Sequence, residues 1–312
     1  MTAPFLICVG NAIVDILVKV EDSFLKSNDL IKGSMSLVNN EEFDNIFSKI
    51  SEYKIESGGS AANTAVGYSS FGGNSIFFGS IGKDNFGLSF QKDLNDIGIQ
   101  FLSSEDNLLN AKTSKSLVLI SPDGERTMCT FLGTAGKINE NDVNIEVVKN
   151  SEMIFLEGYL WDEGEPKKAF EKAIKNANKV AMSLSDQFCV DRHKQHFLDL
   201  VENKLDITFA NEQEIMSLID AKSFDEVINF SKSLGKIIVL TRGDKGAVAI
   251  NKNEVVECGI KQGLKIVDLT GAGDLFAAGF LHGHVNSMTL KECLNKGTEM
   301  SSKVIQQIGA RL

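Results

Sequence analysis

The residues with the clearest chemical role lie in the segment 268–274, which reads Asp-Leu-Thr-Gly-Ala-Gly-Asp. The small and apolar residues that follow it predict a buried helix, with Gly271 and Gly273 at its start. Glycines at a helix N-terminus let backbone N–H groups converge, and the helix dipole favours negative charge there. We therefore expect the N–H groups of Gly271, Ala272 and Gly273 to hold a phosphate or another anion.

Asp274 is the unusual member of this segment. A carboxylate in the first turn of an anion-binding helix repels the anion, unless it takes a proton from the group that attacks that anion. Phosphoryl transfer to an alcohol has this requirement. We therefore expect Asp274 to act as a general base. The alternative is that Asp274 only caps a helix that packs tightly on a strand.

Two common phosphate-binding motifs do not fit the sequence. Phe276 stands where a dinucleotide-binding fingerprint needs its third glycine, and the segment lies far from a first βαβ unit. The run Gly-x4-Gly-Lys-Ser/Thr of the P-loop does not occur. A dehydrogenase is therefore disfavoured, and a P-loop enzyme is excluded.

A second glycine motif, Gly58-Gly59-Ser-Ala-Ala-Asn63, precedes another helix of small residues. Asn11 and Asp15 follow the first predicted strand, in the crevice where open α/β sheets bind ligands. Carboxylate and amide groups can each bind paired hydroxyls, so we expect these residues to hold a neutral polyhydroxyl ligand. The alternatives are a tight loop with close helix packing for the motif and a solvated strand end for Asp15.

Composition limits the class of protein. The chain has 312 residues, of which 43% are hydrophobic and 24% charged, as in an ordinary globular protein. Its net charge of −10 disfavours nucleic acid or an anionic membrane as a partner, although a local site can still be positive. The five cysteines are scattered and odd in number, and Met1–Pro4 shows no signal sequence. These patterns predict a cytoplasmic protein with reduced thiols.

Apolar strands and amphipathic helices alternate along the chain, which predicts a mostly parallel sheet with helices on both faces. The strands are expected at 5–9, 74–81, 153–157, 179–184, 206–210 and 236–241, with a hairpin at 246–250 and 254–258. The helices are expected at 41–51, 60–71, 84–97, 165–177, 193–202, 212–219 and 224–234.

Four further strands do not fit this alternation. They are expected at 15–20, 33–38, 115–120 and 126–132, the last two as a hairpin. We expect them to form a small separate sheet that acts as a lid, built from the segments 15–38 and 112–132. Because no linker or change of composition divides the chain, we expect one domain, 1–312.

With both glycine motifs in view, the chain resembles the PfkB family of carbohydrate and nucleoside kinases. Residues 58–63 look like the first signature of the family, and residues 268–274 look like the second. Residues 79–87, 211–214 and 241–246 are similar to further family segments, so the resemblance covers nearly the whole chain. It implies a ribokinase-like fold, which has three α/β/α layers, a mostly parallel central sheet and a small β-sheet lid.

The resemblance also implies a nucleotide site. Asn211 and Glu214 match an Asn-x-x-Glu motif that organises Mg2+ and its waters around the nucleotide phosphates, and Thr241, Gly243 and Gly246 match the nucleotide-binding strand end. From the residues alone, an Asn and a Glu one helical turn apart supply hard oxygen ligands, although they are more often a capping feature.

Four segments resemble the bacterial adenosine-kinase-like branch of the family: 10–16, 124–128, 157–162 and 183–186. This resemblance implies an ATP-dependent kinase that phosphorylates the primary hydroxyl of a ribose-containing acceptor. Adenosine is the first choice, and a free sugar such as ribose or fructose is the alternative. An adenine ring needs an apolar slot, and Met35, Leu37 and Phe131 could form it or could pack between lid and body.

We thus expect ATP and Mg2+ as cofactors, with Asp268 near a site for a monovalent cation such as K+, as the resemblance implies. The expected partner is a small sugar or nucleoside, and the expected state is a monomer or homodimer. A catalytically silent nucleoside or sugar sensor is the alternative of another class. The presence of Asp274 argues against it.

Overall fold

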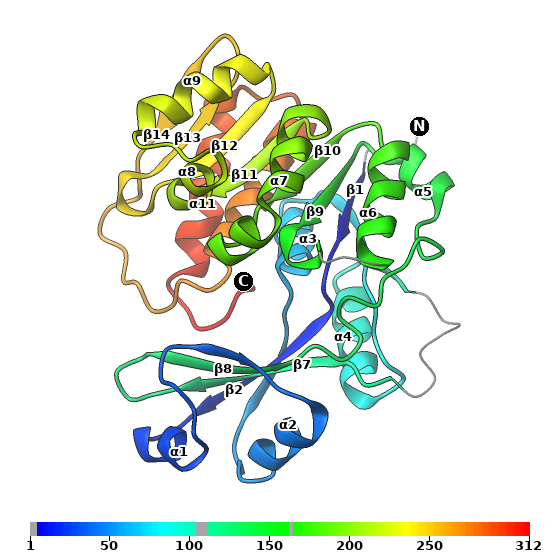
Figure 1. Cartoon of the computed structure of the whole chain (residues 1–312), viewed down its shortest axis with the longest axis vertical. Helices are drawn as coiled ribbons and strands as arrows, with labels where there is room; N and C mark the ends of the chain where they lie inside the picture. Colours follow the sequence, from blue (N-terminus) through cyan, green and yellow to red (C-terminus); the bar gives the residue numbers. More distant parts are fainter. Residues whose placement is uncertain (1–4, 104–110, 162–164) are drawn as a thin grey trace.

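The computed structural model describes residues 5–103, 111–161 and 165–312, so Met1–Pro4 and Asp162 lie outside the described chain. Within these ranges the strands form two sheets, a large one and a small one, which lie apart from each other (Figure 1). The small sheet faces one edge of the large sheet (Figure 1).

Nine described strands form the large sheet, in the order β14 (Val255–Cys258), β13 (Ala247–Ile250), β12 (Ile237–Thr241), β11 (Ile207–Asn211), β10 (Val180–Ser183), β9 (Met153–Glu157), β1 (Phe5–Val9), β5 (Asn74–Phe78) and β6 (Gln100–Leu102). Neighbours are parallel from β12 to β6, whereas β13 pairs antiparallel both with β12 and with β14, its partner in the predicted hairpin. The carboxyl ends of the parallel strands therefore meet at one edge.

Helices cover both faces of the large sheet. One face packs against α3 (Ser60–Ser70), α4 (Asn85–Asp96), α10 (Ala272–Val285) and α11 (Leu290–Val304). The other face packs against α5 (Ile145–Asn150), α6 (Glu165–Asn176), α7 (Gln187–Asn203), α8 (Glu212–Ile219) and α9 (Phe224–Leu234). In β1, Leu6 and Cys8 contribute to the first core, whereas Ile7 and Val9 contribute to the second. Burial on both faces explains the continuous apolar strands, and the predicted three-layer α/β class is confirmed.

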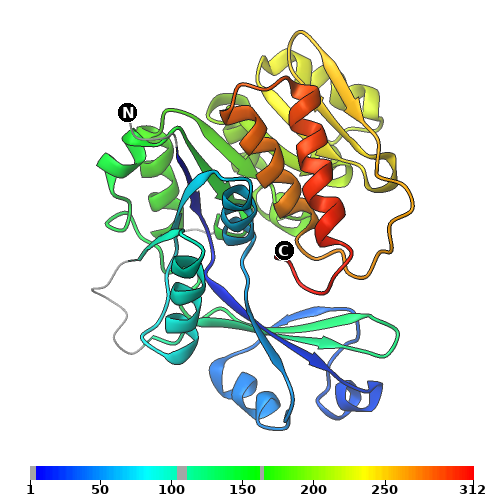
Figure 2. The same cartoon turned by 180° about the vertical axis from the view of Figure 1, so that it is seen from behind.

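Five described strands form the small sheet, in the order β3 (Met35–Leu37), β8 (Arg126–Phe131), β7 (Ser114–Ile120), β2 (Ile13–Lys19) and β4 (Lys54–Ser57). Two short helices, α1 (Asp22–Ser27) and α2 (Asn40–Phe47), pack on one of its faces through an apolar cluster that includes Ile16, Leu117 and Cys129. The opposite face is turned toward the carboxyl edge of the large sheet (Figure 2).

The prediction of a separate small sheet is confirmed, but four strands were expected in it and five are present in the described chain. Strand β4 was missed because its sequence, Lys-Ile-Glu-Ser, is short and mostly polar. Helix α7 was expected from residue 193 but begins at Gln187, where the Asp186 side chain accepts a hydrogen bond from the Cys189 N–H at 2.7 Å. Helices α1, α5 and α11 and strand β6 were not expected.

Two of the connections between the sheets, here called the two crossings, lie at Asn11 and at the first signature. Asn11 lies in the connection between β1 and β2, and Gly58 and Gly59 lie between β4 and α3. The Gly58 N–H donates to the Ile13 carbonyl at 2.7 Å, which holds the two crossings together. The glycine motif is therefore positioned where the two sheets join.

Candidate active site

The two crossings bring the predicted acceptor-binding residues into contact. Gly59 has a φ of +93°, and a Cβ there would overlap the backbone carbonyl oxygen of Asn11. A Cβ at Gly58 would overlap the carboxylate of Asp15. Both glycines are thus required for close approach of the two chain segments, and this explains why a side chain is absent at each position.

Asn11 supplies a buried acceptor atom. Its backbone N–H donates to Glu157 Oε1 at 2.7 Å, whereas its side-chain oxygen Oδ1 is buried without a hydrogen-bond partner. An unpaired buried oxygen is costly unless a ligand supplies a donor. The hydroxyl group of an acceptor molecule fits this requirement.

Glu157, at the end of β9, was not assigned to the site from the sequence. Its side chain is fully buried and accepts hydrogen bonds from the N–H groups of Asn11 and Ala61, both at 2.7 Å. Burial raises the pKa of Glu157 to about 7, although these hydrogen bonds lower it. An acidic residue directly after a buried apolar strand was the signal in the sequence. Glu157 ties the start of α3 to the end of β1.

The carboxylate of Asp274 is held in the first turn of α10 by residues of α3. The hydroxyl of Ser60 donates to Oδ1 at 2.7 Å, and Nδ2 of Asn63 donates to Oδ2 at 3.0 Å. The hydroxyl of Thr64 donates to the backbone carbonyl of Asp274 at 3.2 Å. Burial raises the pKa of Asp274, while Asn63, Ser60 and the Arg311 charge oppose the rise. The arrangement gives a fixed carboxylate with increased proton affinity.

The backbone before Asp274 leaves an open space in front of the helix. Gly271 has a φ of +74°, and a Cβ there would contact Ala310, whereas a Cβ at Gly273 would meet nothing within 4 Å. The N–H of Ala272 was expected to hold an anion, but in this structure it donates to the Leu269 carbonyl at 3.2 Å in a turn. Gly271 and Gly273 therefore remain the better candidates for holding an anion.

Asp268 connects three parts of the molecule. Its buried carboxylate accepts hydrogen bonds from the Thr270 N–H at 3.0 Å and the Gly309 N–H at 2.8 Å, and it pairs with Arg126 from β8 of the small sheet. Arg126 also donates to the Thr270 hydroxyl. Burial acts to raise the pKa of Asp268, but these bonds and the Arg126 charge outweigh it, so the pKa lies below its ordinary value. Arg126 was also missed from the sequence.

Asp15 lies on the face of the small sheet that is turned toward the large sheet. The strand register places Met35 and Leu37 on the same face, and their side chains are 55% and 59% exposed. Burial raises the pKa of Asp15 to about 7, although Arg311 and Arg126 lower it. A carboxylate and two exposed apolar side chains thus share the face of the small sheet that is turned toward the large sheet.

Asn63 is bound differently from the expectation that it holds a sugar. Its side chain is buried, and both ends of its amide are engaged, Nδ2 with Asp274 and Oδ1 with Nε of Arg311 at 3.0 Å. Arg311 was not assigned to the site from the sequence. In this structure Asn63 positions the carboxylate of Asp274.

The predicted nucleotide residues lie farther along the same sheet edge. Asn211 caps α8 and forms a capping box with Glu214, in which each accepts the backbone N–H of the other, at 2.8 and 3.0 Å. Asn211 is the register partner of Thr241 in β12. The turn after β12 contains Gly243 and closes where the Arg242 N–H donates to the Gly246 carbonyl at 2.8 Å. The four predicted nucleotide-binding residues and Glu214 are therefore neighbours.

Glu214 is the carboxylate of this group that a metal would use. Its side chain is buried, and burial raises its pKa to about 7, with the Asp186 charge acting in the same direction. In the part of the chain that the structure describes, no group of three or more His, Cys, Asp or Glu side chains could hold a metal ion. A divalent cation would therefore need oxygens of a phosphate ligand and of water, to which Glu214 adds one charge.

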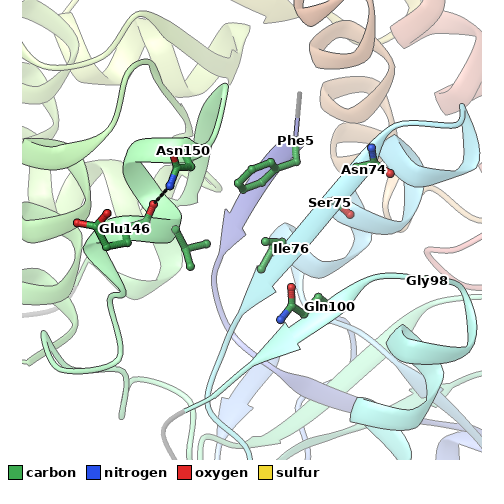
Figure 3. A pocket seen from close by; sticks show the side chains of 9 residues that line it. Phe5, Asn74, Ser75, Ile76, Gly98, Gln100, Glu146 and Asn150 are labelled. Carbon is green, nitrogen blue, oxygen red and sulfur yellow. Dashed lines mark hydrogen bonds between the residues drawn. The ribbon is translucent and has the colours of Figure 1, made fainter. Parts of the chain in front are cut away.

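A separate hollow of about 650 Å3 lies at the opposite edge of the large sheet (Figure 3). It is lined by the first residues of β1 and β5, Phe5 and Asn74, and by Glu146 and Asn150 of α5. It shares no residue with the site described above.

Among the described residues, no helix combines the length and apolar composition that a membrane crossing requires.

Comparisons with known proteins give a consistent result. The pfkB family carbohydrate kinase profile matches residues 25–312. A probable sugar kinase from Rhizobium etli CFN 42 is 36% identical, with a TM-score of 0.90, over 100% of this chain and 96% of that one. The adenosine kinase of Sinorhizobium meliloti is 37% identical, with a TM-score of 0.88 and the same coverage. The adenosine kinase of Saccharomyces cerevisiae is 26% identical and covers 99% of this chain and 96% of its own.

Proposed function

Because the chain belongs to the pfkB family of carbohydrate kinases and is a phosphotransferase with an alcohol acceptor, we propose that it transfers the γ-phosphoryl group of ATP to the primary hydroxyl of adenosine. The observation that carries the proposal is the carboxylate of Asp274. It is fixed by Ser60 and Asn63 beside the open N-terminus of α10. This geometry supports a role for Asp274 as a base beside a backbone that binds the transferred phosphoryl group.

In the proposed reaction, the acceptor hydroxyl attacks the γ-phosphorus while its proton passes to Asp274. The bond to the β–γ bridging oxygen breaks, and ADP leaves with that oxygen. The N–H groups of Gly271 and Gly273 stabilise the charge on the transferred group, together with the α10 dipole. Mg2+ bound with the nucleotide would offset phosphate charge, held in part through water by Glu214.

The acceptor would lie between the sheets. Asn11 and Asp15 would bind the ribose hydroxyls, with Gly58 and Gly59 allowing the chain segments that carry these two residues to approach closely. The exposed apolar side chains of Met35 and Leu37 support a flat, apolar base as part of the acceptor. The similarity to the Sinorhizobium meliloti enzyme supports the same choice.

The small sheet would act as a lid, formed by the segments 15–38 and 112–132. Exclusion of water protects the phosphoryl group from hydrolysis, so a kinase of small alcohols benefits from closure. Contacts of Arg126 with Asp268 and Thr270 support this role, because they connect the small sheet to the anion-binding loop. The whole described chain would work as one catalytic unit.

A sugar kinase is the second candidate, and the similarity to the Rhizobium etli protein supports it. The deciding experiment measures ADP release from ATP and Mg2+ with adenosine, other nucleosides, ribose and fructose. A kcat/KM for adenosine well above that for the free sugars is expected. If only a free sugar is phosphorylated, that sugar replaces adenosine as the proposed acceptor. If no acceptor is phosphorylated, the proposed kinase activity is overturned.

Three further elements of the proposal need their own tests. Both oxygens of Asp268 already accept hydrogen bonds, so K+ near this residue would bind other oxygens. A comparison of the reaction rate in KCl and in NaCl would test whether the enzyme depends on K+. We propose a cytoplasmic location without a nucleic acid or membrane partner, supported by the net charge of −10 and by five buried free cysteines. Cell fractionation tests the location, and light scattering distinguishes a monomer from a homodimer.

A further inference from the structure

The segment that follows α11 returns to the active site. Ile305 accepts hydrogen bonds from the N–H groups of Val267 and Asp268, at 2.8 and 3.2 Å, and Gly309 donates to the Asp268 side chain at 2.8 Å. Figure 1 shows this segment ending between the large sheet and the small sheet. Arg311 is thereby brought to the first signature, far from it in the sequence.

Arg311 makes two directed contacts there. Its Nε donates to Oδ1 of Asn63 at 3.0 Å, and its Nη2 donates to the Gly58 carbonyl at 3.2 Å. The guanidinium carbon lies 5.9 Å from the ring centre of Phe90, a buried residue of α4. The planar group is thus held by the two hydrogen bonds that it donates and by an aromatic neighbour.

These contacts determine which way the Asn63 amide points. An amide has one acceptor end and two donor hydrogens at the other end. Since Arg311 can only donate, it selects the orientation in which Oδ1 of Asn63 faces Arg311 and Nδ2 faces Asp274. The flipped amide would place a donor against the guanidinium and an oxygen against the carboxylate. We propose that Arg311 is a positioning residue that acts through Asn63 to hold and orient the carboxylate of Asp274.

The charges around Arg311 strengthen this arrangement. Burial lowers the pKa of Arg311 to about 10, while four acidic groups on β2, β4, α4 and α10 raise it, so the side chain stays charged at neutral pH. The acidic groups that face it are Asp15, Glu56, Asp93 and Asp274. Two of them also face other charges, since Arg126 lies near Asp15 and Glu157 lies near Asp274. Loss of the Arg311 charge would therefore raise the pKa values of Asp15 and Asp274.

The first experiment, which rests on the proposed function, compares Arg311→Met, Arg311→Lys and the control Lys303→Met over a range of pH. Arg311→Met is expected to lower kcat at least about tenfold, because an oriented charge-assisted hydrogen bond is lost, with little change in the KM for ATP. The acidic limb of its pH profile moves to higher pH. Arg311→Lys keeps the positive charge, so it returns the acidic limb of the pH profile to the wild-type position. It restores only part of kcat, because an ammonium group lacks the planar set of N–H donors of a guanidinium. Lys303 pairs with Glu299 on the surface, so its variant behaves as wild type.

The second experiment is a double-mutant cycle with Asn63→Ala. If Arg311 orients Asp274 through Asn63, adding Arg311→Met to Asn63→Ala lowers kcat no further at a pH above the acidic limb, where Asp274 is unprotonated in every variant. Losses that multiply, or a folded Arg311→Met variant with wild-type kcat and pH profile, would overturn the inference. The same cycle on the free energy of unfolding needs no substrate. This cycle separates the role of Arg311 from the proposed adenosine kinase activity. Additive changes in the free energy of unfolding would rule out the role of Arg311 even if adenosine is phosphorylated. Coupled changes would support that role even if adenosine is not the acceptor.

Discussion

Replacement of Asp274 by Asn removes the proposed base and preserves the shape of the site. The Asn63 amide can still donate to the remaining oxygen at residue 274. The Ser60 hydroxyl, which now donates to Oδ1 at 2.7 Å, can rotate and accept from the new NH2 group. The substitution also removes a charge that burial disfavours. We therefore expect Asp274→Asn to fold with a Tm close to that of the wild type.

The effect on catalysis should be much larger. A positioned general base contributes about 100-fold to 10,000-fold, so kcat should fall at least about 100-fold, a loss of about 2.7 kcal/mol of transition-state stabilisation. ATP binding should be unchanged, because the N–H groups of Gly271 and Gly273 remain. Single-turnover and steady-state measurements of ADP formation, with ATP affinity by calorimetry, check both parts.

The wild-type pH profile gives a second measure of the same residue. Asp274 must be unprotonated to act, and burial holds its pKa above the ordinary value, so kcat/KM falls as the pH is lowered through that raised pKa. The control Ser60→Ala keeps the carboxylate but removes one donor, so its acidic limb should move to higher pH with a smaller loss of kcat. Near-normal turnover by a folded Asp274→Asn variant would refute a role for this carboxylate as base.

Four other outcomes are expected. Asp15→Ala should weaken adenosine binding about tenfold or more, with ATP binding retained, as measured by calorimetry; equal weakening of both ligands would contradict the assignment. Leu37→Ser should raise the KM for adenosine about threefold or more but not that for ribose, whereas the exposed control Ile31→Ser should change neither. Glu214→Gln keeps a capping-box residue but should raise the half-saturating Mg2+ concentration; an unchanged requirement would exclude the residue from the metal site. Without ligands, the Tm should fall between pH 6 and pH 8, because Asp15, Glu157 and Glu214 have folded-state pKa values of about 7, above their unfolded values, and lose protons over this range; a flat or rising Tm would contradict this.

Local patterns in the sequence were sufficient to predict the three-layer fold and the residues around the two glycine motifs. Burial on both faces produces continuous apolar strands, and a glycine run before a small-residue helix depends only on neighbouring residues. The same locality explains the misses in the small sheet. Strand β4 has no apolar pattern of its own, and it is stabilised by pairing with β2, for which the sequence has no local signal.

The missed site residues come from distant parts of the chain. Arg126 reaches Thr270 across 144 positions, and Arg311 reaches Asn63 across 248. A single arginine has no spacing or periodicity, so nothing near it in the sequence indicates its partner. Arg311, which occupies the amide oxygen of Asn63, could be identified only from the fold for the same reason, and the role of Asn63 in holding the acceptor stays a prediction.

The position of Asn11 and of the first signature at the two crossings would also affect how the protein responds to its acceptor. Asn11, Gly58 and Gly59 belong to the connections about which the small sheet would rotate relative to the large one. In the proposed function, a ligand that binds these residues would therefore act directly on two connections of the lid, without a separate element to transmit its presence. Acceptor binding and the angle between the two sheets would then be coupled. A substitution that stiffens either crossing would therefore change the affinity for the acceptor and also the angle that the sheets adopt.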